Sequence, residues 1–171
     1  VASDDSFELA TLSAALRLHS INVVAEAHTE EIAENLYKFL SPQVVLIDLQ
    51  FASAEALALV NKFRKVNPAL GVVLMTACPD FRLLGLVEKQ IPNGSQVILK
   101  RSVSDLTVVS HAINNSISAI LTKEKMSWVD GHGSLHENSF KSILQDFTDI
   151  QIETFRLLAK SIRVVEALSI F

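Results

Sequence analysis

The chain alternates between short, almost fully apolar runs and longer segments in which apolar residues recur at helical spacing. The short runs carry no charge before their last residue, which is typical of strands buried on both faces of a sheet. They predict strands at residues 1–3, 21–25, 44–48, 71–76 and 96–99. The longer segments predict helices at residues 7–18, 29–40, 53–66, 81–90 and 104–123. Strands that alternate with helices of this length favour an α/β fold with a parallel sheet covered on both faces.

The pattern changes after residue 123. Residues 126–138 contain Gly131 and Gly133 and have no apolar period, which indicates a linker. A helix is predicted at residues 148–160, and a second helical piece near Arg163. We therefore expect an α/β domain at residues 1–123, a linker at 124–146 and an all-α fragment at 147–171.

Composition and charge indicate what kind of protein this is and in which compartment it works. Of 171 residues, 49% are hydrophobic, so the chain can bury a core without disulfides, and its single cysteine cannot form an internal one. A net charge of -4 gives no whole-chain attraction to nucleic acid. The apolar runs are too short to span a bilayer and no signal peptide opens the chain, so we expect a cytoplasmic protein without a membrane partner. Because the chain begins at Val1 without an initiator methionine, we also expect that the natural N-terminus is missing.

Polar side chains follow the predicted strands at their carboxyl ends, where open α/β sheets bind ligands. These candidates are Asp4, Asp5, Asp48, Thr76 and Lys100. Taken singly, each has an ordinary explanation: an aspartate at a strand end, a threonine in a strand, a lysine on the surface. Asp4 and Asp5 also suit the cap of the following helix, so one of them can cap while the other binds a ligand. Only the convergence of all five at one edge indicates a site.

The chemistry expected there is phosphoryl acceptance with Mg²⁺. Unpaired carboxylates about 4 Å apart repel by roughly 4 kcal/mol at an effective dielectric near 20, so cations must balance them. Lys100 supplies one positive charge, and Mg²⁺ would be held by Asp5, Asp48 and the backbone carbonyl of Gln50, with Asp4 direct or through water. Asp48 is then the candidate nucleophile. Thr76 and Lys100 would bind the oxygens of the transferred phosphoryl group.

Four segments in order, "ASDDSF", "VVLIDLQ", "VVLMTA" and "VILKRS", resemble the signature segments of the receiver domain of bacterial response regulators. The resemblance covers about residues 1–123. It implies a flavodoxin-like (βα)5 fold with strand order 2-1-3-4-5, phosphorylation of Asp48 by a sensor histidine kinase, and no enzyme activity beyond the domain's own phosphotransfer and dephosphorylation.

The segment "FTDIQIETFRLLAKSI" is similar to the first helix of the NarL/LuxR-type helix-turn-helix output domain. By this resemblance the protein regulates transcription by binding DNA through a full-length output domain. The recognition helix, which would enter the major groove, is absent from the 171 residues. The resemblance also implies a possible homodimer.

Three positions depart from the receiver pattern. Ala52 stands where many receivers have proline, Val97 where an aromatic switch residue is common, and Arg101 where many have proline. Ala52 and Val97 favour an alternative, a receiver-like dimerisation or docking module that works without phosphate. A phosphatase of the haloacid dehalogenase type also uses a strand-end aspartate with Mg²⁺. It ranks last because Gln50 stands where that type has a second aspartate.

Overall fold

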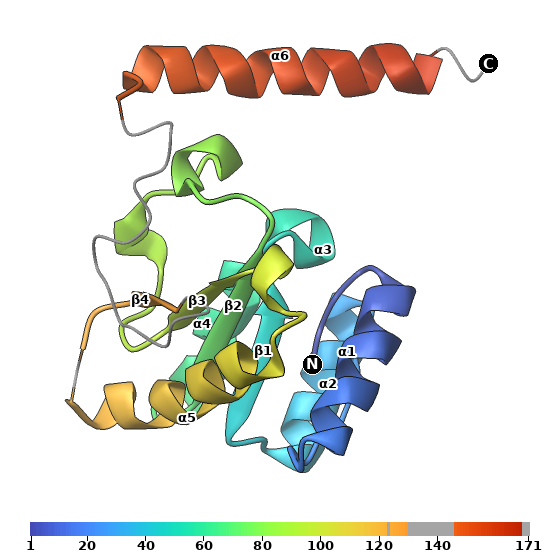
Figure 1. Ribbon diagram of the computed structural model, residues 1–171, viewed down its shortest axis with the longest axis vertical. Helices are drawn as coiled ribbons and strands as arrows, with labels where there is room; N and C mark the ends of the chain where they lie inside the picture. Colours follow the sequence, from blue (N-terminus) through green and yellow to red (C-terminus); the bar gives the residue numbers. More distant parts are fainter. Residues whose placement is uncertain (123, 130–145, 169–171) are drawn as a thin grey trace. The chain divides into compact units, whose positions relative to one another are not determined.

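A parallel sheet of four strands forms the centre of the protein. The computed structural model describes residues 1–122, 124–129 and 146–168, with the backbone alone for residues 53, 54 and 159–168. The strands are β1 (Val44–Asp48), β2 (Gly71–Thr76), β3 (Gln96–Leu99) and β4 (Ser127–Val129), in the order β1-β2-β3-β4 (Figure 1). The bounds of β1, β2 and β3 are those predicted from the sequence, because these buried runs end sharply.

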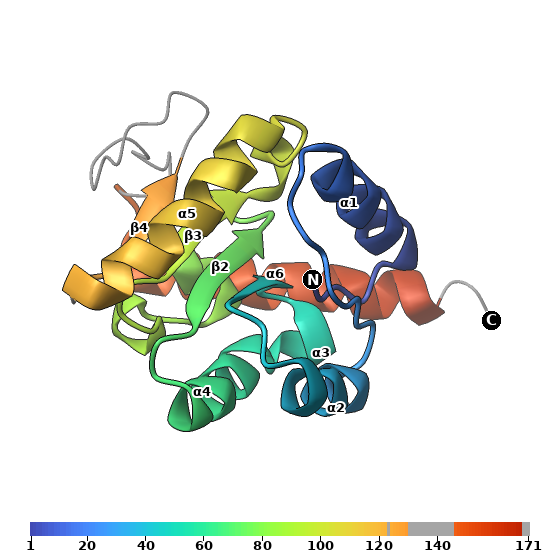
Figure 2. The ribbon, with the colours of Figure 1, turned by 90° about the horizontal axis from the view of Figure 1, so that it is seen from below.

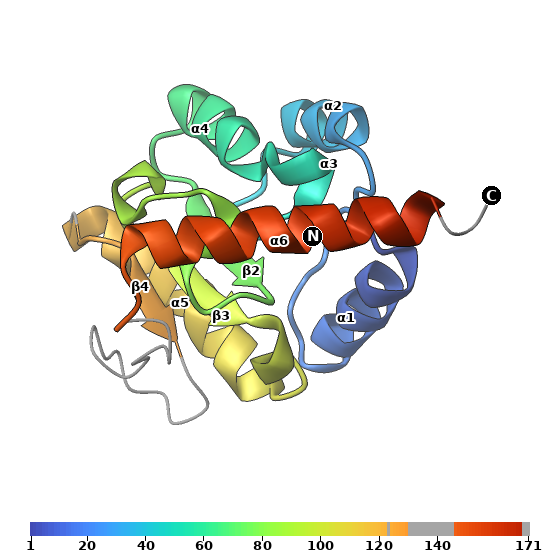
Figure 3. The ribbon, with the colours of Figure 1, turned by 90° about the horizontal axis from the view of Figure 1, so that it is seen from above.

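Helices cover both faces of the sheet, as predicted. They are α1 (Ser6–Leu18), α2 (Glu30–Leu40), α3 (Phe51–Ala54), α4 (Ala56–Val66) and α5 (Leu106–Thr122). α1 and α5 lie on one face, and α2 and α4 lie on the other (Figures 2 and 3). The α/β, flavodoxin-like fold class is therefore confirmed. No helix in the described part of the chain is long and apolar enough to cross a membrane.

The core on the α1 and α5 face follows the two-residue period of the strands. Leu46, Met75 and Ile98 point from the sheet into a cluster with Leu16 of α1 and Val109 of α5. On the opposite face, the ring of Tyr37 in α2 stacks on Phe63 in α4 with centroids 4.0 Å apart. The two layers fix the sheet, and with it the carboxyl ends of its strands.

The helix ends obey the local signals in the sequence. The side chain of Thr29 caps α2 by accepting the Ile32 N–H at 3.3 Å. Ser41 ends the same helix in the left-handed region at φ 44°, just before Pro42. The predicted boundaries of α1 and α2 are each confirmed to within one residue.

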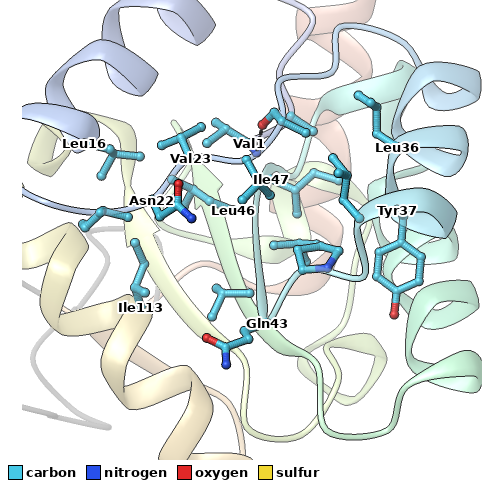
Figure 4. Close-up of a pocket in the computed structure, with 18 of the residues that line it drawn as sticks. Val1, Leu16, Asn22, Val23, Leu36, Tyr37, Gln43, Leu46, Ile47 and Ile113 are labelled. Atoms are coloured by element: carbon cyan, nitrogen blue, oxygen red, sulfur yellow. Dashed lines mark hydrogen bonds between the residues drawn. The ribbon is translucent and has the colours of Figure 1, made fainter.

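The first predicted strand is reduced to two isolated bridges made by Ala2, and the second is not formed at residues 21–25. Ala2 pairs in parallel with Ala27 on one side and Ile47 on the other, which agrees with the order 2-1-3-4-5. The predicted strand at residues 21–25 does not form; contact with the N-terminal segment is limited to the Ala27 bridge and the hydrogen bond from the Val1 amino group to the Ala25 carbonyl at 3.0 Å. A cavity of about 540 Å³ borders the segment, lined by Val23, Leu46 and other apolar side chains (Figure 4).

Two predicted helices have a different form. Residues 81–90 make two 3₁₀ turns, η1 (Phe81–Leu84) and η2 (Glu88–Gln90), because Gly85 adopts φ 71° between them and breaks the helix. The helix predicted at residues 53–66 is divided at Glu55 into α3 and α4. Ala52 in α3 has φ 52°, a left-handed conformation that no apolar period reveals.

The strand β4 was not predicted, and it lies inside the segment interpreted as a linker. It pairs in parallel with β3, and the Ser127 N–H donates to the Ser95 carbonyl at 3.0 Å. Val129 is buried against the core cluster. Three residues are too few to show a period, so only the pairing reveals this strand. The rest of the predicted linker, residues 130–145, lies outside the described residues.

Residues Cys78–Gln90 and the described residues 146–168 belong to a second compact unit. Its helix α6 (Asp149–Leu168) is continuous, so the prediction of a second helix starting near Arg163 is wrong. Thr148 and Gln151 form a capping box, in which Thr148 Oγ1 accepts the Gln151 N–H at 3.3 Å and Gln151 Oε1 accepts the Thr148 N–H at 2.8 Å. Arg82 of η1 donates to the Phe147 carbonyl at 3.1 Å and to Asp149 at 3.2 Å.

Several apolar side chains on the described part of α6 are exposed. Ile152 is buried, whereas Ile150 is 80% exposed and Leu158 is 53% exposed. Phe155 packs edge-on against Phe147 with ring centroids 5.4 Å apart, yet 45% of it is exposed. Ile150, Phe155 and Leu158 therefore form an exposed apolar surface on the described part of α6.

Gly71 gives a direct test of packing between the sheet and α5. A Cβ atom added to this residue would lie 2.6 Å from Ser116 Oγ and 2.9 Å from Val44 Cγ2. We expect Gly71→Ala to lower the free energy of unfolding by about 2 kcal/mol, because the core is overpacked. Urea denaturation measures this change. The double variant with Ser116→Ala should recover part of the loss, and an unchanged Gly71→Ala protein would contradict this packing.

Candidate functional site

The carboxyl ends of β1, β2 and β3 meet at one edge of the sheet and carry three of the predicted site residues. Asp48 is the last residue of β1 and is in register with Met75. Thr76 ends β2 in register with Leu99, and Lys100 follows Leu99 directly. Asp48 is 6% exposed and Thr76 is fully buried, so β1 and β2 hold both side chains in a packed environment.

Lys100 forms the central contact of this site. Its Nζ lies 2.7 Å from Asp48 Oδ2 and 2.8 Å from Glu8 Oε2. Burial lowers the pKa of Lys100, but hydrogen bonds to Asp48 and then Glu8 outweigh that effect and leave the pKa above its ordinary value. The ammonium therefore stays protonated and neutralises part of the negative charge.

The second oxygen of Asp48 is held by the backbone. Asp48 Oδ1 accepts the N–H of Gln50 at 3.0 Å. With Oδ2 on Lys100 and Oδ1 on this N–H, the carboxylate has a fixed orientation. A carboxylate oxygen held in this way is oriented to act as a nucleophile.

Asp4 and Asp5 perform different tasks. Asp5 caps α1, and its Oδ1 accepts the N–H groups of Phe7 and Glu8, each at 2.9 Å. Asp4 instead reaches the loop after Asp48, where its Oδ1 accepts the Ala52 N–H at 3.2 Å. The sequence interpretation that one aspartate can cap the helix agrees with this arrangement. The role of either aspartate, or of the Gln50 carbonyl, as a metal ligand stays a prediction.

Glu8 belongs to this site, and the sequence analysis did not find it. Its Oε2 accepts hydrogen bonds from Lys100 Nζ and from Ser3 Oγ, both at 2.8 Å. The available signal was weak: Glu8 lies three residues after Asp5, in the first turn of α1, where acid is ordinary. Glu8 and Lys100 lie 92 residues apart in the chain, so only the fold brings them together.

The charge balance of the site fits a divalent cation. Two carboxylates, those of Glu8 and Asp48, share the Lys100 ammonium, and two more, Asp4 and Asp5, lie on the segment just before α1. Within the described ranges, no three His, Cys, Asp or Glu side chains are close enough to form a ready-made metal cluster. Mg²⁺ needs only one or two carboxylates and completes its shell with water and substrate oxygens, so the oxygen donors present suit it.

The structure explains why proline is absent at position 52. Ala52 has φ 52°, whereas proline is restricted to a φ of about −65°. The Ala52 N–H also donates to Asp4 at 3.2 Å, and proline has no such group. The departure from the receiver pattern therefore follows from the local backbone and links the loop to Asp4.

Comparisons with known proteins agree on the fold. The structure of RcsB from Salmonella enterica serovar Typhimurium bound to promoter rprA is similar over 71% of this chain and 63% of that one, at 22% identity and a TM-score of 0.53. The isolated receiver domain of RcsB from the same organism is similar over 70% of this chain and 94% of that one, at 19% identity and a TM-score of 0.50. Both were determined with the phosphomimetic BeF3-.

One curated relative supplies a different context. A cyclic di-GMP phosphodiesterase of Thermotoga maritima is 21% identical over 164 residues, which are 92% of this chain and 42% of that protein. The chain thus spans less than half of this relative and under two thirds of the full-length RcsB structures. No protein-family model matches the chain. At these identities the likeness concerns the fold, and the chain has the fold of a response-regulator receiver domain.

Proposed function

We propose that this chain is the phospho-accepting receiver module of a two-component response regulator. The observation that carries the proposal is the Asp48 carboxylate, held at the end of β1 by Lys100 at 2.7 Å and by the Gln50 N–H at 3.0 Å. An ionised and oriented carboxylate beside a fixed ammonium is suited to attack phosphorus. The receiver fold supports the same function.

In the proposed reaction, an oxygen of Asp48 forms a bond to the phosphorus of a phosphohistidine on a sensor kinase. The P–N bond breaks, and the imidazole leaves with its electron pair. Lys100 would donate hydrogen bonds from its ammonium to the phosphoryl oxygens, and Thr76 would bind another of these oxygens. Mg²⁺, held by Asp4, Asp5, Asp48 and the Gln50 carbonyl, would neutralise charge on the phosphoryl oxygens when bound. The chain acts on its own aspartate and turns over no external substrate.

The output of the regulator is proposed to be transcription. Residues 147–171 supply the similarity to the first part of a NarL/LuxR-type helix-turn-helix, and α6 carries the exposed apolar residues that such a fragment leaves uncovered. DNA binding would require the full-length output domain. One similar structure is that of RcsB bound to promoter rprA, which supports this output for a protein of the same receiver fold. A homodimer is a further expected partner.

A receiver-like docking module that works without phosphate is the second candidate. The contact between Glu8 and Lys100 at 2.8 Å favours it, because an internal carboxylate already occupies the lysine that would bind the phosphoryl group. Val97 of β3 stands where an aromatic switch residue is common in receivers, and it is fully buried. Both candidates share the fold and differ in whether Asp48 accepts phosphate.

Intact-mass spectrometry after incubation with acetyl phosphate and Mg²⁺ separates these candidates. We expect one labile phosphoryl adduct in the natural sequence and complete loss of it in Asp48→Asn, because the amide has no nucleophilic oxygen. Asp105→Asn is the matched control, since Asp105 is an exposed aspartate that binds Thr107 at the start of α5. An adduct that survives in Asp48→Asn would contradict the assignment. No adduct in a folded natural protein would favour the docking module.

A further inference from the structure

Glu8 forms an ion pair with Lys100, the lysine that would bind the phosphoryl group in the proposed reaction. Its Oε2 lies 2.8 Å from Lys100 Nζ, while Asp48 Oδ2 lies 2.7 Å from the same nitrogen. The two carboxylates therefore share one ammonium. The side chains of Glu8 and Lys100 are 25% and 24% exposed, so water screens this contact only in part.

The position of Glu8 is fixed independently of Lys100. Ser3 Oγ donates to Glu8 Oε2 at 2.8 Å, which holds the carboxylate toward the site. The α1 cap is made by the Asp5 side chain and does not use the side chain of Glu8. The charged groups around the shared nitrogen are Glu8 and Asp48 in direct contact, with Asp4 and Asp5 on the adjoining segment.

Phosphorylation would place more negative charge on Asp48, directly opposite Glu8. The phosphoryl group carries roughly two negative charges, about one more than the carboxylate it replaces, and needs donors such as the Lys100 ammonium. Like charges that share a site disfavour one another, and an ammonium divided between two anions stabilises each of them less. Glu8 thus opposes the phosphoryl group both by repulsion and by competition for Lys100.

We propose that Glu8 is a built-in competitor for Lys100 that restrains phosphorylation of Asp48. This inference rests on the proposed function, since it describes the regulation of the same site. Glu8 acts through Lys100 and is a positioning residue. In the reaction with acetyl phosphate, an Asp48 oxygen bonds to phosphorus while the bond from phosphorus to the acetyl oxygen breaks and acetate leaves. Glu8 raises the free energy of the charged product without taking part in the bond changes.

The test uses Glu8→Gln, which removes the charge and keeps the size and the acceptor for Ser3. We expect acetyl phosphate to form the adduct about tenfold faster in this variant, and beryllofluoride to bind about tenfold more tightly. A tenfold change corresponds to about 1.4 kcal/mol. Glu26→Gln is the matched control, because it removes one charge and one ion pair, with Arg17, in the same compact unit. The control should leave both quantities unchanged.

The outcomes separate the inference from the proposed function. An adduct that forms equally fast, or more slowly, in Glu8→Gln overturns the competitor role while the phospho-acceptor function stands. An adduct seen only in Glu8→Gln, and lost again when Asp48→Asn is added, supports both. No adduct and no beryllofluoride binding in either folded protein overturns the proposed function and the inference with it. Circular dichroism of each variant establishes that it is folded.

Discussion

Replacing Lys100 with methionine is expected to slow phosphoryl adduct formation by about 100-fold, the scale of removing one preorganised donor from a reacting oxyanion. The same variant should lower the free energy of unfolding. Lys100 Nζ binds both Asp48 and Glu8, and Asp48 is only 8% exposed in its side chain. Without the ammonium, two carboxylates face each other in a partly buried site, which costs about 3 kcal/mol.

Two measurements check this prediction. Urea denaturation reports the free energy of unfolding, and intact mass over time reports adduct formation. Lys62→Met is the control, because Lys62 pairs with Glu34 on the surface and is 58% exposed. Loss of that pair should change stability by less than about 1 kcal/mol and leave adduct formation unaltered. If Lys100→Met behaves like Lys62→Met in both measurements, Lys100 has no central part in the site.

Replacing Ala52 with proline is expected to lower the free energy of unfolding by about 3 kcal/mol or more. The native φ of 52° is inaccessible to proline, and the substitution removes the N–H that donates to Asp4 at 3.2 Å. The cost falls on the loop that also orients Asp48 through the Gln50 N–H. Thermal or urea unfolding measures this loss.

The matched variant is Ala52→Gly, which should stabilise the fold by about 1 kcal/mol. Glycine adopts the left-handed region without the steric cost that alanine carries there, and it keeps the N–H. A proline variant as stable as the natural protein would show that the loop adopts a different backbone. Equal stability of all three proteins would show that the positive φ costs nothing.

The contacts of Lys100 and Asp4, at the site proposed to accept the phosphoryl group, also stabilise the fold. Lys100 offsets the repulsion among the carboxylates, and Asp4 holds the loop that follows Asp48. A change at the Asp48 carboxylate would therefore alter contacts that also stabilise the sheet edge. Under the proposed function, phosphorylation of Asp48 would be reported through these contacts, by redistributing Lys100 between Asp48 and Glu8.

Much of the fold and of the site was predictable from local pattern. The bounds of β1, β2 and β3 were correct, because a strand buried on both faces is a continuous apolar run. Asp48, Thr76 and Lys100 could be placed at one edge because parallel strands align their carboxyl ends. Of these three side chains, Lys100 and Asp48 are in direct contact at 2.7 Å, although β2 lies between their strands.

The errors have separate local causes. The strand expected at residues 21–25 is replaced by a single bridge at Ala27, and the helix expected at 81–90 is interrupted by the positive φ of Gly85. The three residues of β4 are too short for a period, and the continuous α6 shows no break near Arg163. Strand pairing and helix continuation depend on neighbours and backbone angles, which the apolar pattern does not encode.

The sequence by itself determined the layers of the fold, the order of its elements and the residues at the strand ends, because burial and the strand and helix periods are local properties. Only the tertiary structure decided that Asp5 caps α1 while Asp4 binds the loop at Ala52. It alone placed Glu8 on Lys100, across 92 residues of chain. Contacts between distant residues depend on how the layers pack, and a side chain's role at the site is set by which partner lies within hydrogen-bonding distance.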